Sequence, residues 1–139
     1  MRLFYPSAFA TLALCYVEVP PGALYISQIE DKTADQDLLI SDGKLVPGNK
    51  MYTFQYDAIG TLKSVATAQY LSVDESGRLV LDILPNSGFL LTLESFSSSK
   101  RALSYNGVEV FELCQDNSIA CKSKCAGARS ILVMYQDVT

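Results

Sequence analysis

The chain has 139 residues, which is enough for one domain with a hydrophobic core and short for two. Its net charge of -4 argues against a nucleic-acid partner, because binding to phosphates requires a basic surface. The absence of histidine argues against common hydrolase and zinc chemistry, because histidine is the usual general base and metal ligand near neutral pH.

Residues 1–19 have the pattern of a secretory signal peptide. One arginine is followed by an apolar run that ends before Glu18 and is shorter than the roughly 20 residues of a membrane span. Small residues allow cleavage after Ala13, which retains Cys15 in the mature chain, or after Cys15, which removes it. We therefore expect one secreted domain over residues 20–139, with no membrane span in the mature chain.

Short runs of alternating or continuous apolar residues predict strands along the rest of the chain. The expected strands are 24–29, 38–41, 44–46, 51–57, 68–73, 78–83, 89–93, 102–105, 108–113 and 130–135. Residues 30–37, EDKTADQD, are expected to form a polar surface loop. No window predicts an amphipathic helix of three turns. The sequence thus predicts an all-β fold, a compact small barrel or sandwich of about nine or ten short antiparallel strands.

Turn residues separate several of these strands. Asp42-Gly43 and Asn106-Gly107 each predict a tight type I′ hairpin turn, and residues 74–77 predict a four-residue hairpin loop. Gly43, Gly77 and Gly107 recur at intervals of about 30 residues, which would fit three copies of a repeated unit. Hairpins of any all-β protein recur at a similar interval, so a β-trefoil-like arrangement remains an alternative to the sandwich and the simple barrel.

Three cysteines, Cys114, Cys121 and Cys125, follow the last predicted hairpin. Behind a signal peptide they favour a disulfide over a zinc site, because structural zinc usually takes four Cys or His ligands. We expect one bridge, from Cys114 to either Cys125 or Cys121, worth about 2 to 3 kcal/mol. The leftover thiol would pair with Cys15, if that residue is retained, or between molecules. No metal or cofactor site is predicted.

Acidic residues form two groups that are candidates for catalysis. Glycoside hydrolysis requires two carboxylates facing each other across a sugar cleft. The candidates are Glu30, Asp31, Asp35, Asp37, Asp74 and Glu75. Carboxylates in turns and loops more often cap the backbone or face solvent. We therefore predict no catalytic residues and no enzymatic activity.

Tyrosine supplies more of the aromatic residues than any other type, with eight tyrosines and no tryptophan. Exposed tyrosines stack on sugar rings, which would suit a lectin-like module. The candidate carbohydrate contacts are Tyr52, Tyr56, Tyr70 and Asp57. The three tyrosines also lie in predicted strands, where strand propensity and core packing are sufficient to account for them.

Three segments, LLISDGKLVPGNKMYTFQYD, AQYLSVDESGRLVLD and VFELC with a later cysteine, carry a resemblance to a known family. They resemble the C-terminal cysteine-containing domain of fungal cell-wall mannoproteins of the Pir type and related secreted fungal wall proteins. Residues 54–57 match that family's aromatic-Gln-aromatic-Asp run, and residues 111–114 match its cysteine-containing strand end. The chain lacks the Gln-rich repeats through which those proteins are attached to β-1,3-glucan.

These observations lead to one principal hypothesis and two alternatives. The resemblance implies a non-catalytic secreted protein, a structural component of a fungal cell wall or extracellular matrix. Its partners would be wall polysaccharide or other wall proteins. A carbohydrate-binding module is the first alternative, and a small secreted toxin or effector is the second.

Overall fold

The computed structural model describes residues 18–95 and 98–138, and it confirms the prediction of an all-β fold. This part of the chain contains strands and no helix. The strands are β1 (Gly22–Ile29), β2 (Lys32–Ser41), β3 (Lys44–Pro47), β4 (Thr53–Asp57), β5 (Thr61–Ser64), β6 (Tyr70–Val73), β7 (Leu79–Asp82), β8 (Phe89–Leu93), β9 (Lys100–Tyr105), β10 (Val110–Leu113), β11 (Ile119–Ala120) and β12 (Arg129–Asp137).

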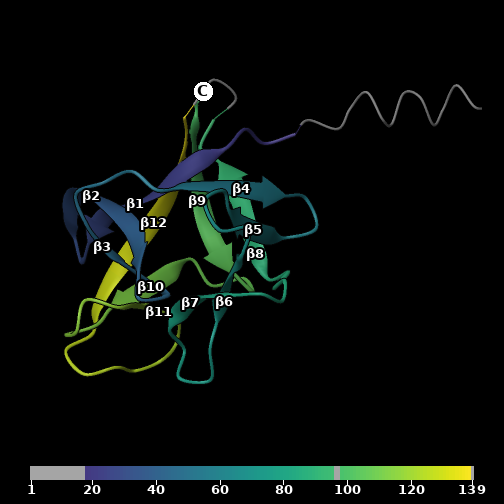
Figure 1. The fold of residues 1–139 in the computed structure, drawn as a ribbon. Helices are drawn as coiled ribbons and strands as arrows, with labels where there is room; N and C mark the ends of the chain where they lie inside the picture. The colour runs from purple at the N-terminus through teal and green to yellow at the C-terminus, as the bar shows by residue number, and fades with distance from the viewer. Residues whose placement is uncertain (1–17, 96–97, 139) are drawn as a thin grey trace, which may run out of the picture.

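Seven of the strands close into an antiparallel barrel (Figure 1). The pairing runs β1-β2-β3-β7-β6-β5-β4, and β4 returns to β1. Closure occurs because β1 has two partners in succession: Gly22 and Ala23 pair with β4, and the residues from Tyr25 to Ile29 pair with β2. A closed barrel is therefore present, which decides against an open sandwich. It is compatible with the β-trefoil alternative, because a trefoil also contains a barrel and the hairpins β2–β3, β6–β7 and β10–β11 recur every four strands.

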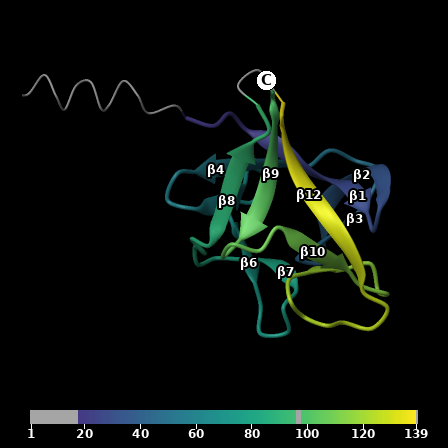
Figure 2. The same cartoon turned by 180° about the vertical axis from the view of Figure 1, so that it is seen from behind.

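The remaining strands are organised by β12, which pairs with β1 over almost its whole length. β9 pairs with the end of β12 and β10 with its beginning. β8 adds to β9, and Figure 2 shows these two strands beside β12. The continuous apolar run 130–135 was predicted to be a central strand, and its three strand partners confirm that position.

The core forms where alternating strand residues point inward. Leu24 and Ile26 of β1, Phe54 of β4 and Tyr135 of β12 are fully buried. Because successive side chains of a strand point to opposite faces, Tyr25 and Ser27 point outward between them. The inner face of β1 thus stabilises the barrel while its outer face remains available for binding.

The prediction that residues 30–37 form a surface loop is wrong, because β2 begins at Lys32 and only Glu30 and Asp31 form the turn. The segment is polar because β2 is half exposed there. Thr33, Asp35 and Asp37 alternate along it, which is the two-residue period of a strand with one solvated face. Composition indicated a loop, whereas the spacing of the polar residues indicated a strand.

The predicted Asn106-Gly107 hairpin is also corrected by the structure. Both residues have positive φ, 49° and 84°, so the local turn forms as expected. The flanking strands are joined only by the Tyr105–Val108 bridge, and β9 and β10 each pair with β12 instead. For both β9 and β10, pairing with β12 thus replaces the pairing with each other that the turn predicted. The Asp42-Gly43 and 74–77 hairpins form as predicted.

Two short strands, β5 and β11, were not predicted from the sequence. β5 carries buried Thr61 and Ser64, whose polarity conceals a strand in the barrel wall. β11 has only two residues, Ile119 and Ala120, and pairs with β10. Both pair with strands next to them in the chain, β5 with β4 and β6, and β11 with β10.

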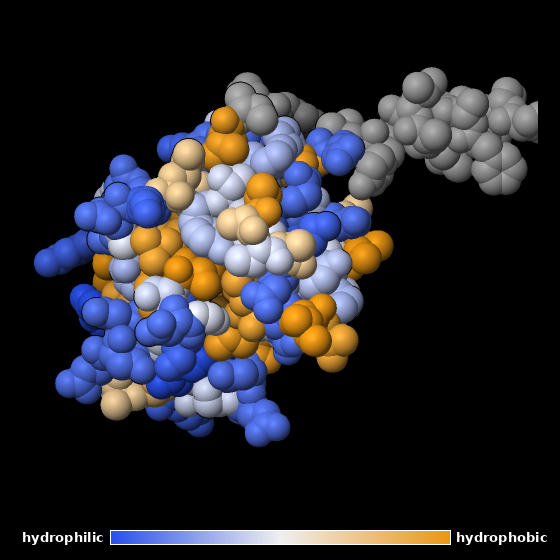
Figure 3. Space-filling view, in the orientation of Figure 1, coloured by the Kyte–Doolittle hydropathy of each residue, from blue (hydrophilic) through white to orange (hydrophobic). Residues whose placement is uncertain are grey.

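The surface is mixed in character, and Figure 3 shows apolar residues gathered in separate groups among polar ones on this face. The most exposed large apolar side chains include Ile83, Ile59 and Leu84, at 73, 70 and 67%. The described residues contain no helix with the length and apolar character that a membrane span requires.

Candidate functional site

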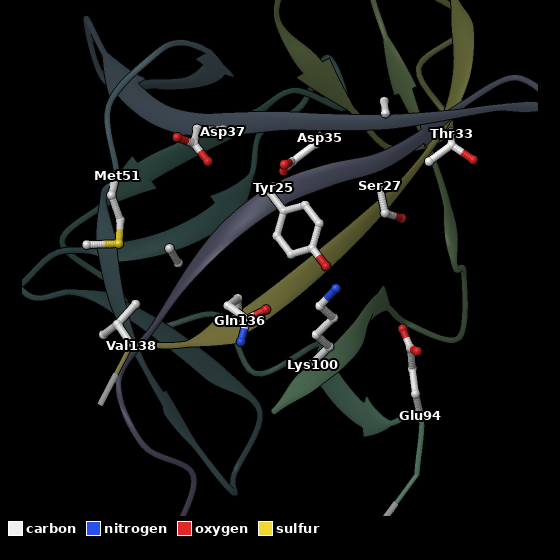
Figure 4. A pocket seen from close by; sticks show the side chains of 12 residues that line it. Tyr25, Ser27, Thr33, Asp35, Asp37, Met51, Glu94, Lys100, Gln136 and Val138 are labelled. Atoms are coloured by element: carbon white, nitrogen blue, oxygen red, sulfur yellow. The ribbon is translucent and has the colours of Figure 1, made fainter. Parts of the chain in front are cut away.

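A groove of about 560 Å³ lies over the outer face of β1, β2 and β12, and we name it the Tyr25 groove. Figure 4 shows the Tyr25 ring across its middle, with Met51 and Val138 toward one end and Thr33 and Glu94 toward the other. Its lining residues are Ala23, Tyr25, Ser27, Thr33, Ala34, Asp35, Asp37, Met51, Glu94, Lys100, Gln136 and Val138.

A double irregularity in strand pairing shapes this groove. Ile26 and Gln28 of β1 pair with Val133 and Leu132, which are consecutive in β12, so Ser27 is an extra residue. On the other side, Ser27 faces two residues of β2, Ala34 and Asp35. Such bulges redirect side chains and are frequent beside functional sites. Here Ser27, Ala34 and Asp35 all line the groove.

Tyr25 is the central side chain of the groove. Burial raises the pKa of its phenol above the usual value of 10.0, and the nearby Lys100 ammonium acts in the opposite direction. Figure 4 shows the phenol oxygen pointing toward the Lys100 amine. Because the phenol remains protonated near neutral pH, Tyr25 presents an aromatic ring and a neutral hydroxyl to a ligand.

The groove contains more acidic side chains than basic ones. Asp35 and Asp37 extend from β2, and Glu94 lies on the opposite side next to Lys100 (Figure 4). Three carboxylates and one amine therefore line the groove. Within residues 18–95 and 98–138, no group of three or more Cys, Asp or Glu side chains is arranged to hold a metal ion. The groove offers a negatively charged surface with several hydrogen-bond acceptors.

The cysteines form a separate structural site. A disulfide joins Cys114, at the end of β10, to Cys125. The enclosed loop is also held by Glu112, whose carboxylate accepts hydrogen bonds from the Ser123 amide and hydroxyl at 2.9 and 2.7 Å. Cys121 is buried with a free thiol, and burial raises its pKa. One of the two predicted pairings is therefore the correct one, and Cys15 lies outside the described residues.

The predicted carbohydrate contacts do not line one surface. Tyr56 belongs to the core at 8% exposure, and its hydroxyl donates to the Phe89 carbonyl at 3.3 Å. Tyr52 is half-buried and its hydroxyl lies 2.8 Å from that of Ser64. Tyr70 and Asp57 do meet, in a smaller pocket of about 180 Å³.

The acidic candidates are also divided among different places. Glu30 and Asp31 lie at the β1–β2 turn in a pocket that includes Arg129. Asp74 and Glu75 lie in the β6–β7 turn, where the Asp74 carboxylate accepts hydrogen bonds from the Ser76 amide and hydroxyl and from the Arg78 amide. Only Asp35 and Asp37 reach the Tyr25 groove.

Sequence reasoning did not assign Tyr25, Ser27, Glu94, Lys100 or Gln136 to a binding site. The sequence did contain a signal for the part of the groove that β1 forms, because polar and aromatic residues alternate with core residues in this strand. The contribution of Glu94 and Lys100 had no such signal, since it depends on the end of β8 and the start of β9 lying close to the outer face of β1.

The fold and site define a small disulfide-bonded β-barrel protein with a polar, aromatic-centred surface groove. No protein-family model, curated protein or solved structure gives a significant match to this chain.

Proposed function

We propose that this chain is a non-catalytic secreted protein that serves as a structural component of a fungal cell wall or extracellular matrix. The observation that carries the proposal is the Cys114–Cys125 disulfide. Structural disulfides persist in oxidising, extracellular environments and are rare in the cytosol. The bridge, together with the signal-like residues 1–19, supports export.

The closed barrel suits a structural role. β4 returns to β1, so the seven-strand ring presents few free edges. The disulfide and Glu112 fasten the connection between β11 and β12 to β10. These features favour durability in a setting without chaperones.

The absence of catalysis is supported by the chemistry of the groove. The chain contains no histidine to act as a general base. The Tyr25 phenol has a raised pKa and stays protonated near neutral pH, so it acts as a hydrogen-bonding group and not as a base. Binding is the activity that these residues support best.

The test is secretion of the full chain from a fungal host, followed by fractionation and intact-mass measurement before and after reduction. We expect the protein in the medium or wall fraction, shortened after Ala13 or after Cys15 and carrying one internal disulfide. A matched variant that begins at residue 20 should stay inside the cell. Retention of the intact chain in the cytosol with all four thiols open to alkylation would overturn the proposal.

A further inference from the structure

We propose that the Tyr25 groove binds a saccharide chain that carries free amino groups, such as a partly deacetylated polymer of N-acetylglucosamine. The inference deepens the proposed function and rests on it, because a polysaccharide of this kind would be encountered outside the cell. It assigns a ligand class to a groove that the sequence did not reveal.

The first argument is the position of the aromatic ring. Tyr25 is half-buried in the middle of the groove, so its ring is held in place by β1 while part of it remains accessible. A sugar ring has one apolar face of C–H groups, and an immobilised aromatic ring is a suitable surface for it. Little side-chain entropy is lost on binding, because partial burial already restricts the Tyr25 side chain.

The second argument is the density of hydrogen-bonding groups around that ring. Ser27 and Thr33 supply hydroxyls, Gln136 supplies an amide, and all three line the groove with Tyr25. Figure 4 shows these groups distributed around the ring and not gathered at one point. A ligand with many hydroxyls along its length would match this distribution.

The third argument is charge, which distinguishes an amino sugar from a neutral one. Asp35, Asp37 and Glu94 line the groove together with one cationic residue, Lys100. A cationic amine gains charge-assisted hydrogen bonds to the carboxylates, which are stronger than bonds to neutral hydroxyls. The net charge of -4 adds a long-range electrostatic attraction for a cationic saccharide.

The fourth argument is shape. The volume of about 560 Å³ lies within the roughly 300–1,000 Å³ typical of ligand sites. Figure 4 shows a groove that is longer than one side chain, from Met51 and Val138 to Thr33 and Glu94. An extended chain that lies along β1 would contact both ends.

The binding experiment uses the secreted full chain and calorimetry in EDTA with three soluble hexamers: glucosamine, N-acetylglucosamine and β-1,3-linked glucose. We expect the glucosamine hexamer to bind at least about tenfold more tightly than the glucose hexamer, with the difference reduced at high salt. Absence of binding, equal affinity for the three hexamers, or binding that requires a divalent cation would overturn the inference.

Variants locate the site. Tyr25→Ala should weaken glucosamine binding about tenfold or more, and Asp35→Asn with Asp37→Asn should do the same while barely changing N-acetylglucosamine binding. Glu75→Gln and Tyr105→Phe are matched controls outside the groove. If Tyr25→Ala does not fold, as judged by circular dichroism, the Asp35→Asn/Asp37→Asn variant decides the question alone, because Asp35 is exposed and Asp37 is half-buried. If Tyr70→Ala abolishes binding while the Tyr25 and Asp35/Asp37 variants still bind, the site lies in the smaller pocket and the inference is overturned.

The two proposals fail separately. A secreted, oxidised protein that binds none of the hexamers refutes the ligand assignment and leaves the structural role. A purified protein that binds glucosamine through Asp35 and Asp37, but is retained in the cytosol by its host, refutes the extracellular role.

Discussion

The hydroxyl of Tyr135 lies 2.6 Å from the carbonyl oxygen of Pro20, to which it donates a hydrogen bond across 115 residues of sequence. The Phe54 carbonyl lies 3.2 Å from the same hydroxyl. One fully buried side chain of β12 thus connects the segment before β1 with β4, next to the point where the barrel closes.

Replacing Tyr135 by phenylalanine should lower the free energy of unfolding by about 1 to 3 kcal/mol, because buried carbonyl groups lose their partner. Urea denaturation followed by circular dichroism would measure the change. Tyr52→Phe is the control, since the Tyr52 hydroxyl bonds to the Ser64 hydroxyl in a half-buried position and its loss should cost less. Equal effects of the two substitutions would contradict the role assigned to Tyr135.

Gly22 lies against the same tyrosine. A Cβ at Gly22 would come within 2.3 Å of the Tyr135 ring and 2.7 Å of the Gln136 carbonyl oxygen. Because that ring is buried and hydrogen-bonded, Gly22→Ala should destabilise the protein by about 1 to 3 kcal/mol. Gly48→Ala is the matched control: the three atoms nearest its Cβ would all belong to the flexible, half-buried Leu39 side chain, which can move. A larger loss of stability at Gly48 than at Gly22 would be inconsistent with this packing.

The Cys114–Cys125 bridge should contribute about 3 kcal/mol, the value expected for a loop of this length. The measurement compares unfolding of Cys121→Ala with that of the Cys114→Ser/Cys125→Ser/Cys121→Ala variant. The shared Cys121→Ala change prevents disulfide exchange. Peptide mapping without reduction should find residues 114 and 125 linked in the unmodified protein. A bridge to Cys121 in that map would refute the pairing.

Asp74 should make stability depend on pH in the acid range. Although partial burial acts in the opposite direction, hydrogen bonds from Ser76 and Arg78 hold its pKa below the usual 3.8. A depressed pKa in the folded state means that the contribution is complete above the unfolded value and is lost as pH falls through the folded one. Asp74→Asn should therefore flatten the stability profile between about pH 5 and 2 and cost less than about 1 kcal/mol at pH 7, because the site is exposed.

Glu75→Gln provides the control for this measurement, since Glu75 is its neighbour in the same turn. We expect its stability profile to follow that of the unsubstituted protein more closely than the Asp74→Asn profile does. If the stability profile is flattened in Glu75→Gln and unchanged in Asp74→Asn, the pH dependence comes from Glu75 and the prediction for Asp74 is wrong.

Much of the fold follows from short-range pattern. The alternation in residues 24–29, the Asp42-Gly43 turn and the apolar run 130–135 each predicted an element that the structure contains. These signals are reliable because turn geometry and the two-residue period depend on neighbouring residues only. The cysteine spacing likewise limited the bridge to two pairings.

The choice of strand partners required the tertiary structure. Asn106-Gly107 forms its turn, yet β10 pairs with β12, because a long buried strand offers more pairing and apolar contact than the preceding β9 does. The Tyr25 groove depends on the same long-range order: a bulge at Ser27 exists only when β2 and β12 lie on either side of β1. Local sequence therefore decides which residues form strands and turns, whereas the burial of side chains distant in sequence decides which strands meet and what surface they enclose.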